Sequence, residues 1–399
     1  MNLLKEEKKN KVLQSMMQIL DKEREEIITE NKKDLEAFSK DDCAMYDRLV
    51  VDNEKVDSMI QSVREVMEQE DPVGKTISST SLENGLEIIN KTDPFGKIMI
   101  IYESRPDVTI EAAVLAFKAN NKILLKGGKE AINSNKILVD CWHRALEENG
   151  LDKDWVQLLV LDRKETQDFM VNSSKDLDLI VPRGGEKLIQ FVKENAQCAV
   201  LISGRGNNFI YVAKDADWNK SLDIILNAKT HKISACNALD KILIDKNMPQ
   251  YEQRLKELQS ILKQNNVEIL VDEKVKETLS EEQKIEDNDV WYEEFLALKA
   301  CIGAVDGQKE AIGKINKYSG GHSNSIMTED SEMAKKFMEE VDSAAVYHNA
   351  STRFTDGGQM GVGAELAIST DKLHHRGPLG LKQLVTNKYY VYGNGQIRK

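Results

Sequence analysis

The chain has 399 residues, of which 41% are hydrophobic and 31% charged, and its formal net charge is −12 at pH 7. This length exceeds the usual size of one hydrophobic core, so we expect two or three domains. The acidic balance argues against non-specific binding to nucleic acid or acidic membranes. The sequence has no apolar run of membrane-spanning length and no signal-like start, so we expect a cytoplasmic protein without nucleic-acid or membrane partners.

The cysteines and histidines do not suggest a metal site. No Cys-x-x-Cys pair occurs, and the one adjacent histidine pair, His374-His375, would point its two rings in different directions. We therefore expect neither a zinc site nor a disulfide framework. The five cysteines are Cys43, Cys141, Cys198, Cys236 and Cys301.

Two segments have the pattern of subunit-pairing strands. After a charged, helix-favouring region to about residue 70, residues 76–92 flank an Asn84-Gly85 turn and predict a β-hairpin with little core of its own. Near the other end of the chain, Tyr389–Tyr392 predicts an aromatic strand. We expect these segments to pair with another subunit in a homodimer or larger homo-oligomer; alternatively, the hairpin caps its own domain.

From residue 97 the chain alternates between apolar runs and helical stretches, which is typical of parallel α/β sheets. We expect two α/β domains with a boundary near Ser203–Gly206. The acidic segment Glu273–Glu294 indicates a solvated helix and loop. The expected strands lie at 97–102, 122–126, 156–161, 177–181, 198–202, 208–213, 241–245, 267–271, 298–305 and 323–328.

Two glycine-containing turns follow expected strands. They are Lys126-Gly127-Gly128-Lys129 and Pro182-Arg183-Gly184-Gly185. Each leads from a strand toward a helix, where backbone amides and a helix N-terminus bind phosphate. Neither matches the Gly-x-Gly-x-x-Gly fingerprint, so each turn alone is also typical of an ordinary connection.

Cys236 lies in a polar stretch between an expected helix and an expected strand. Lys229, His231 and Lys232 precede it, and nearby positive charge lowers the pKa of a thiol. Cys236 is therefore either a reactive thiolate or a buried core cysteine.

A second polar loop, Asn349–Gln359, surrounds Arg353 with hydroxyls, amides and glycines. This composition suits an anionic small molecule bound by a guanidinium and by backbone donors. The alternative is a glycine-rich surface loop.

Six segments together carry a family resemblance: Pro94–Gly96, Tyr102–Thr109, Pro182–Gly185, Cys236-Asn237, Gly321–Ser323 and Val346–Gly380. They resemble the glutamate-5-semialdehyde dehydrogenases, also called γ-glutamyl phosphate reductases, of the aldehyde dehydrogenase superfamily. The resemblance implies an aldehyde dehydrogenase-like α/β fold with two Rossmann-like domains and an oligomerisation hairpin. Residues 1–203 would bind the cofactor, 204–364 would carry the nucleophile, and 365–399 would return to the cofactor domain and form an oligomerisation strand.

The implied reaction is NADPH-dependent reduction of L-glutamate 5-phosphate to L-glutamate 5-semialdehyde, the second step of proline biosynthesis. Cys236 matches the superfamily nucleophile, whose attack on the acyl carbon expels phosphate and leaves a thioester for reduction. Lys126 matches a lysine at the adenosine ribose, and Glu294 resembles a glutamate at the nicotinamide ribose; each could instead be a solvated surface charge. Glutamate 5-kinase is a candidate partner.

Three departures from the superfamily pattern are informative. Ile202–Gly206 contains no carboxylate where hydrolytic relatives carry a general base, which favours a thioester that resists water. Lys129 stands where NAD-using relatives often have glutamate, and a cation there favours the 2′-phosphate of NADP(H). No asparagine occurs in Glu103–Arg105, so we expect the Cys236 backbone N–H to bind the oxyanion, with a second donor unidentified.

The sequence thus predicts a catalytic Cys236 and two sets of binding residues. Arg105 and Arg353 are candidates for the phosphate or the α-carboxylate of the substrate. The alternatives are another aldehyde or CoA-acylating dehydrogenase of the same fold, or a catalytically silent partner of a proline-pathway kinase. The cofactor set is Lys126, Gly127, Gly128, Lys129, Pro182, Arg183, Gly184, Gly185 and Glu294, and the substrate set is Ser104, Arg105, Asn237, Arg353 and Thr355.

Overall fold

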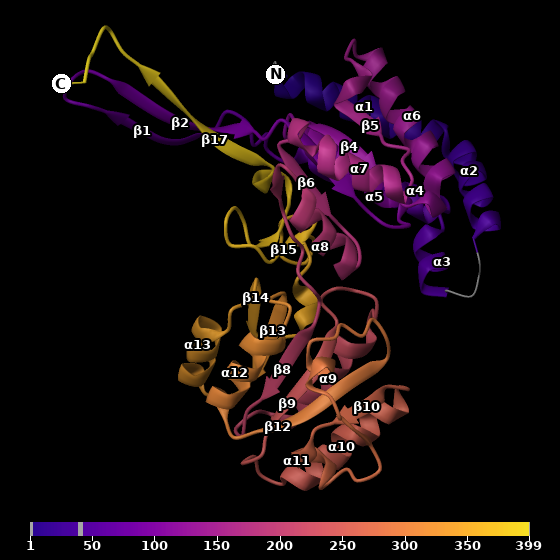
Figure 1. The fold of residues 1–399 in the computed structure, drawn as a ribbon, viewed down its shortest axis with the longest axis vertical. Helices are drawn as coiled ribbons and strands as arrows, with labels where there is room; N and C mark the ends of the chain where they lie inside the picture. The colour runs from indigo at the N-terminus through magenta and orange to yellow at the C-terminus, as the bar shows by residue number, and fades with distance from the viewer. Residues whose placement is uncertain (1–2, 39–42, 399) are drawn as a thin grey trace. The chain divides into compact units, whose positions relative to one another are not determined.

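The computed structural model describes residues 3–38 and 43–398, and the chain divides into two compact units (Figure 1). Unit 1 comprises Met1–Ile202, Gly361–Ala367 and Leu379–Lys399, and unit 2 comprises Ser203–Met360 and Ile368–Pro378. The first break falls between Ile202 and Ser203, next to the segment Ser203–Gly206. The expected uninterrupted return from residue 365 is not found, because Ile368–Pro378 belongs to unit 2.

Unit 1 contains a five-stranded parallel sheet in the order β5-β4-β3-β6-β7. Apolar side chains alternate across the central strand, since Ile98 and Ile100 join one hydrophobic cluster and Met99 and Ile101 join another. Both faces of the sheet are therefore buried. The elements are β3 (Lys97–Ile101), α5 (Pro106–Lys118), β4 (Lys122–Lys126), α6 (Ile132–Glu148), β5 (Val156–Leu158), α7 (Arg163–Asn172), β6 (Leu179–Pro182), α8 (Glu186–Asn195) and β7 (Ala199–Val200).

Four helices precede this sheet: α1 (Glu6–Lys22), α2 (Arg24–Ala37), α3 (Cys43–Leu49) and α4 (Asn53–Glu68). Helices α1 and α4 bury an apolar stripe that includes Leu13, Met16 and Val63, and this stripe joins the cluster that also contains α5 and α6. The helical spacing of these residues explains why the segments fold as amphipathic helices.

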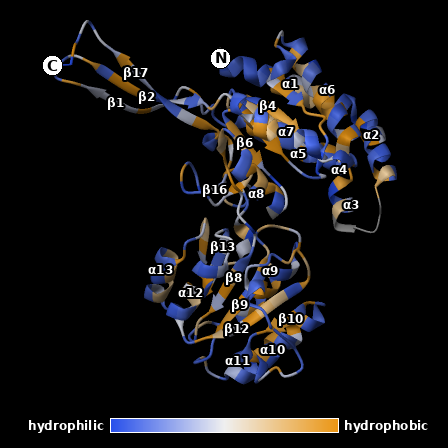
Figure 2. Cartoon of the chain, in the orientation of Figure 1, coloured by the Kyte–Doolittle hydropathy of each residue, from blue (hydrophilic) through white to orange (hydrophobic). Residues whose placement is uncertain are grey.

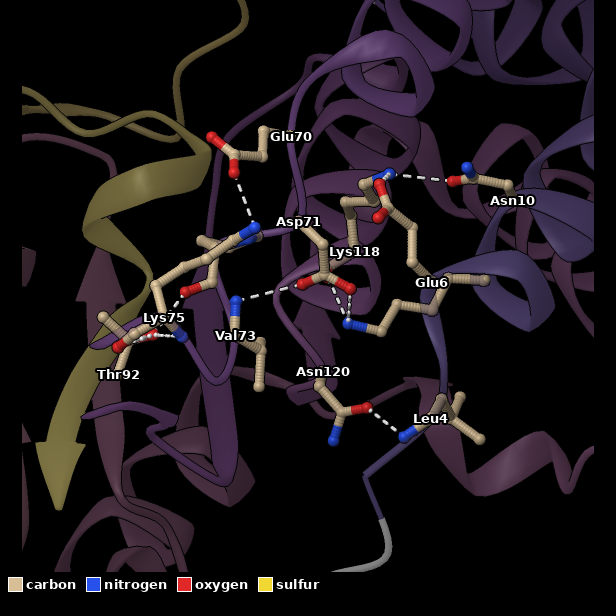
Figure 3. Close-up of polar contacts among 12 residues, drawn as sticks. Leu4, Glu6, Asn10, Glu70, Asp71, Val73, Lys75, Thr92, Lys118 and Asn120 are labelled. Atoms are coloured by element: carbon tan, nitrogen blue, oxygen red, sulfur yellow. Dashed lines mark hydrogen bonds and ion pairs between the residues drawn. The ribbon is translucent and has the colours of Figure 1, made fainter. Parts of the chain in front are cut away.

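Two fully buried lysines, Lys9 and Lys118, tie α1 and α5 to the chain after α4. Figure 3 shows Lys118 close to Glu6 and Asn10, and Asp71 nearby. The Nζ of Lys9 donates to Asp71 Oδ2 at 2.7 Å and to the Lys118 carbonyl at 2.9 Å. The Nζ of Lys118 donates to Asn10 Oδ1 at 2.8 Å and to Glu6 Oε1 at 3.2 Å. Burial lowers the pKa of Lys9, whereas Asp71 favours its charged form.

A three-stranded antiparallel arm belongs to unit 1, and its order is β1-β2-β17. It consists of β1 (Thr76–Ser81), β2 (Glu87–Pro94) and β17 (Val385–Tyr392) (Figure 1). The aromatic C-terminal strand thus pairs with β2 of its own chain, from Val385 opposite Pro94 to Tyr392 opposite Glu87. Figure 2 shows hydrophobic and hydrophilic stretches interspersed along this arm. Five large side chains of the arm are exposed, namely Ile77, Leu82, Tyr389, Val391 and Tyr392.

Unit 2 contains a seven-stranded parallel sheet in the order β11-β10-β12-β9-β8-β13-β14. Helices α9 and α10 pack on one face, and α12 and α13 pack on the other. The elements are β8 (Asn208–Val212), α9 (Trp218–Thr230), β9 (Leu239–Asp245), α10 (Tyr251–Gln264), β10 (Glu268–Val271), α11 (Glu273–Lys276), β11 (Gln283–Lys284), β12 (Lys299–Val305), α12 (Gln308–Tyr318), β13 (Ser323–Met327), α13 (Ser331–Glu340), β14 (Ala345–His348), β15 (Ile368–Ser369) and β16 (Gly377–Pro378).

The acidic segment Glu273–Glu294 is only partly solvated, contrary to expectation. Strand β11 extends the sheet beside β10, and Trp291 is 3% exposed. The Trp291 ring stacks on Phe209 of β8 with the ring centroids 6.3 Å apart. One large aromatic side chain therefore anchors a segment whose average composition is polar. Among residues 3–38 and 43–398, no helix has both the length and the apolar character needed to cross a membrane.

The buried Lys9–Asp71 pair leads to a stability prediction. Asp71→Ala leaves the fully buried Lys9 ammonium without its carboxylate, so we expect the free energy of unfolding to fall by about 3 kcal/mol in urea denaturation. The adjacent Glu70→Ala breaks only the exposed pair with Lys75 and is expected to cost less than about 1 kcal/mol. Equal losses in the two variants would contradict this assignment.

Candidate active site

Cys236 is exposed, in the loop that joins α9 to β9. Two backbone hydrogen bonds shape this loop, from Ala235 N to the Lys232 carbonyl at 3.2 Å and from Ala238 N to the Ala235 carbonyl at 2.9 Å. The Cys236 carbonyl accepts a hydrogen bond of 2.8 Å from Asn208 Nδ2. Exposure of the thiol excludes the alternative of a buried core cysteine and leaves Cys236 accessible to a substrate.

One of the three basic residues that the sequence placed before Cys236, Lys229, is engaged elsewhere in the structure. Lys229 is fully buried, and its Nζ lies 2.8 Å from Asp240 Oδ1, so its charge is already compensated there. Arg353, by contrast, interacts electrostatically with Cys236. A further cation near Cys236 therefore comes from a loop that is distant in sequence, because Asn237, the residue after Cys236, hydrogen-bonds to the carbonyls of Arg353 and Thr355.

The loop that carries Arg353, residues 349–358, is clamped to the residue that follows Cys236. Asn237 Nδ2 donates to the Thr355 carbonyl at 2.9 Å and to the Arg353 carbonyl at 3.2 Å. Thr352 Oγ1 donates in return to the Asn237 carbonyl at 2.7 Å. We expected Asn237 and Thr355 to bind substrate. Both residues are buried, and Asn237 Nδ2 and Thr355 Oγ1 are engaged in hydrogen bonds within the protein, whereas Asn237 Oδ1 has no partner within the described residues; their role in substrate binding stays a prediction.

The guanidinium of Arg353 has unused hydrogen-bonding capacity. Its Nε and Nη1 are buried and have no partner within the described residues, and its Nη2 lies 3.5 Å from His231 Nδ1. Burial lowers the pKa of Arg353, whereas Cys236 and Asp356 favour its charged form. Leaving a buried guanidinium unsatisfied is costly, and a carboxylate or phosphate is the group that satisfies its forked donors. The side chain therefore suits an anion beside Cys236.

Strand β9 also supports the segment that contains Glu294. The Nζ of Lys241 donates to the Glu293 carbonyl at 2.8 Å and lies 3.6 Å from the centroid of the Phe295 ring. Asp240 Oδ2 accepts from the Phe295 N–H at 2.9 Å. Burial lowers the pKa of Lys241 to about 8. Glu294 itself is half-buried in this anchored segment.

The other predicted cofactor residues gather in unit 1 at the carboxyl ends of neighbouring strands. Lys126–Lys129 follows β4, and Pro182–Gly185 lies at the end of β6, on either side of β3. The strand order reverses next to β3, and such a switch point is where open α/β sheets bind ligands. Gly185 N donates to Glu103 Oε1 at 3.1 Å, which joins the loops after β6 and β3.

Lys126 and Lys129 present two different amines in the first of these loops. Lys126 is half-buried, its Nζ donates to the Gly127 carbonyl at 2.9 Å, and burial lowers its pKa while Glu130 raises it. Lys129 is exposed at the start of a short 3₁₀ helix, Lys129–Ala131, that precedes α6. A side chain at Gly127 would collide with Asn135, since its Cβ would lie 2.2 Å from Asn135 Nδ2.

Two predicted substrate residues, Ser104 and Arg105, lie after β3 in unit 1. Ser104 is 2% exposed, and Arg105 Nη2 pairs with Asp107 Oδ2 at 3.2 Å. Burial would raise the pKa of Asp107, but Arg105 and Lys55 lower it overall. Part of the Arg105 charge thus compensates a buried carboxylate.

Sequence reasoning missed Asn208, Ser323 and Tyr347 as parts of this site. Gly321–Ser323 was noted for its resemblance, but no role was assigned to it. Tyr347 OH and Ser323 Oγ both contact Thr355 Oγ1. Within the described ranges, no group of three or more His, Cys, Asp or Glu side chains could hold a metal ion.

The close contact of Gly206 with Cys236 leads to a prediction. A Cβ on residue 206 would lie 2.0 Å from the Cys236 carbonyl oxygen and 2.6 Å from its Cα, both backbone atoms. We expect Gly206→Ala to displace the loop. The rate of enzymatic turnover, or the rate at which iodoacetamide alkylates Cys236, is expected to fall by at least about tenfold. Gly313→Ala is the control, because nothing lies within 4 Å of that added Cβ. Wild-type behaviour of Gly206→Ala would contradict the contact.

Comparison with known proteins places this chain in a family. The aldehyde dehydrogenase family model matches residues 3–278. A gamma-glutamyl phosphate reductase of Clostridium beijerinckii is 43% identical over 392 residues, covering 98% of this chain and 94% of that protein. The crystal structure of gamma-glutamyl phosphate reductase from Thermotoga maritima is 40% identical, with a TM-score of 0.93 over 99% of this chain and 95% of that chain. An acetylating aldehyde dehydrogenase from Geobacillus thermoglucosidasius, 17% identical over 99% of this chain and 94% of that chain with a TM-score of 0.69, shares the fold. The chain therefore belongs to the aldehyde dehydrogenase family and, within it, to the γ-glutamyl phosphate reductases.

Proposed function

We propose that this chain is a cytoplasmic, NADPH-dependent reductase that converts L-glutamate 5-phosphate to L-glutamate 5-semialdehyde and phosphate, the second step of proline biosynthesis. The observation that carries the proposal is the exposed Cys236 beside Arg353, whose buried Nε and Nη1 have no partner within the described residues. A thiol nucleophile next to an anion receptor suits a substrate that is both an acyl donor and an anion. The family membership supports the same reaction.

In the proposed mechanism, the Cys236 thiolate attacks the acyl carbon of the substrate. A carbon–sulfur bond forms, the carbon–oxygen bond to phosphate breaks, and phosphate leaves with the bonding electron pair. Arg353 binds an anionic group of the substrate and favours the thiolate through its charge. The Cys236 backbone N–H is the proposed oxyanion donor. The product of this step is a thioester on Cys236.

Bound NADPH would supply the hydride that reduces this thioester to the aldehyde. In unit 1 we assign its binding to Lys126, the Gly127-Gly128 turn, Lys129 and Pro182–Gly185, and in unit 2 to Glu294. The carboxyl-end position of the two turns and the joined loops after β3 and β6 fit a dinucleotide. The exposed ammonium of Lys129 suits the 2′-phosphate that distinguishes NADP(H) from NAD(H).

Two alternatives make different demands on the site. Another aldehyde dehydrogenase or a CoA-acylating enzyme would resolve the thioester with water or CoA, but Ile202–Gly206 contains no carboxylate to activate water. A catalytically silent partner of a proline-pathway kinase would not need an accessible thiol, whereas Cys236 is exposed. Glutamate 5-kinase remains a proposed partner, since acyl phosphates hydrolyse readily and direct transfer would protect them.

The reverse reaction tests the proposal. We expect NADP⁺ reduction with glutamate semialdehyde to require inorganic phosphate, and to be lost in Cys236→Ser but retained in Cys198→Ser, which alters a half-buried cysteine of unit 1. NAD⁺ is expected to show a KM at least about tenfold higher than NADP⁺ because it lacks the 2′-phosphate. Reduction that ignores phosphate would favour an ordinary dehydrogenase, and no reduction at all would favour the silent partner.

We also propose that the β1-β2-β17 arm forms a subunit interface in a homodimer or larger homo-oligomer. Tyr389 and Val391 are 62% and 56% exposed on an edge strand, which is a common setting for strand or face pairing. Sedimentation is expected to give an oligomer for the wild type and a smaller species for Tyr389→Lys/Val391→Lys. Leu373→Lys, at a fully exposed position of unit 2, is the control. A monomeric wild type would remove the proposed interface.

A further inference from the structure

A chain of side-chain hydrogen bonds runs from the core of unit 2 to the Arg353 loop, residues 349–358. His322 Nδ1 lies 2.7 Å from Ser323 Oγ, and Ser323 Oγ donates to Thr355 Oγ1 at 2.6 Å. Tyr347 OH lies 2.7 Å from the same Thr355 oxygen. Thr355 is thus held by side chains from two strands, β13 and β14, that are themselves paired in parallel.

The surroundings of the imidazole determine its charge state. One ring nitrogen, Nδ1, is held by Ser323 Oγ, and the other, Nε2, is buried without a partner within the described residues. His322 is fully buried, and burial lowers its pKa to about 4, so the ring is neutral at physiological pH. A neutral, fully buried imidazole therefore anchors the inner end of the chain.

The outer end of the chain is directly connected to the nucleophile loop. The backbone carbonyl of Thr355 accepts from Asn237 Nδ2 at 2.9 Å, and Asn237 follows Cys236. Arg353 lies two residues before Thr355, and its own carbonyl accepts from the same amide at 3.2 Å. A shift of Thr355 would therefore move the guanidinium of Arg353 relative to the thiol of Cys236.

We propose that the hydroxyls of Ser323, Thr355 and Tyr347, anchored on the imidazole of His322, set the position of Arg353 and so determine how tightly the anionic part of the substrate binds beside Cys236. These are positioning residues, since they act through the Arg353 loop. The identity of the substrate rests on the proposed function, but the positioning of an anion receptor beside an accessible thiol does not.

Two readouts separate this proposal from the proposed function. The first is protection of Cys236 from iodoacetamide by inorganic phosphate or by L-glutamate, which requires no turnover. Cys141, Cys198 and Cys301 contribute little background, because burial raises the pKa of Cys141 and of Cys301 to about 12 and raises the pKa of Cys198. Cys236→Ser measures the alkylation of the other cysteines. Arg353→Ala identifies for which of the two anions the protection of Cys236 depends on Arg353. The second readout is the reverse reaction, with separate KM values for semialdehyde, phosphate and NADP⁺.

Matched variants of the chain supply the test. Thr355→Val removes the hydroxyl and keeps the shape, Thr355→Ser keeps the hydroxyl, and Tyr347→Phe removes a single oxygen atom. The relevant anion is the one, phosphate or L-glutamate, whose protection of Cys236 depends on Arg353. We expect the concentration of this anion that gives half-maximal protection to be about tenfold higher in Thr355→Val and in Tyr347→Phe. Thr355→Ser is expected to remain within about twofold of wild type, and the KM for NADP⁺ is expected to remain unchanged in all three variants.

Three results would overturn the proposal: wild-type anion dependence in Tyr347→Phe, equal defects in Thr355→Ser and Thr355→Val, or no effect of Arg353→Ala on either anion. If Thr355→Val does not fold, Tyr347→Phe decides the outcome, because it changes one half-buried hydroxyl. Anion protection with the expected variant pattern but without semialdehyde oxidation would support the positioning chain and reject the proposed reaction.

Discussion

The candidate active site depends on the side-chain amide of one buried residue, Asn208 at the start of β8. Its Nδ2 lies within hydrogen-bonding distance of the carbonyl oxygens of Gly206, Cys236 and Ala238, at 2.8, 2.8 and 2.7 Å. Its Oδ1 accepts from the backbone N–H of Ser323 at 3.0 Å. Buried backbone carbonyls that lie outside regular ladders need such partners. One amide thus connects the entry to β8, the nucleophile loop and the start of β13.

The nucleophile loop is therefore held through its backbone groups, while the thiol of Cys236 remains accessible. Gly206 lets the backbone of Cys236 approach more closely than any side chain at position 206 would allow. From the other side, Asn237 and Thr352 attach the loop to the Arg353 loop. The loop thus contacts neighbouring segments through the carbonyl of Cys236 and through the residues on either side of Cys236. Such preorganisation is what a covalent nucleophile requires.

Local features of the site could be predicted from the sequence, and its long-range contacts could not. Alternation of apolar runs and helices correctly predicted the α/β fold, because burial of each strand is a local property of composition. Lys229, His231 and Lys232 were all expected to place positive charge near Cys236, and sequence proximity does not reveal that Lys229, the penultimate residue of α9, pairs with the buried Asp240. Arg353 was found as an anion-binding candidate from its loop composition. Its approach to Cys236 depends on the strand order around β8 and β13, which periodicity does not specify.

Buried charge in unit 2 is used mainly to fix geometry. Asp240 is 2% exposed and binds both the Nζ of Lys229 and the N–H of Phe295, so one carboxylate joins α9 to the segment that carries Glu294. A buried ion pair contributes little net stability because desolvation offsets its Coulomb energy. Its value here is that strand β9, which follows Cys236 directly, supports the Glu294 segment through both Asp240 and Lys241. The guanidinium of Arg353 is the contrasting case, a partly desolvated cation whose Nε and Nη1 lack partners within the described residues. Compensated charges thus define the scaffold of unit 2, and the incompletely compensated one is where we propose that an anion binds.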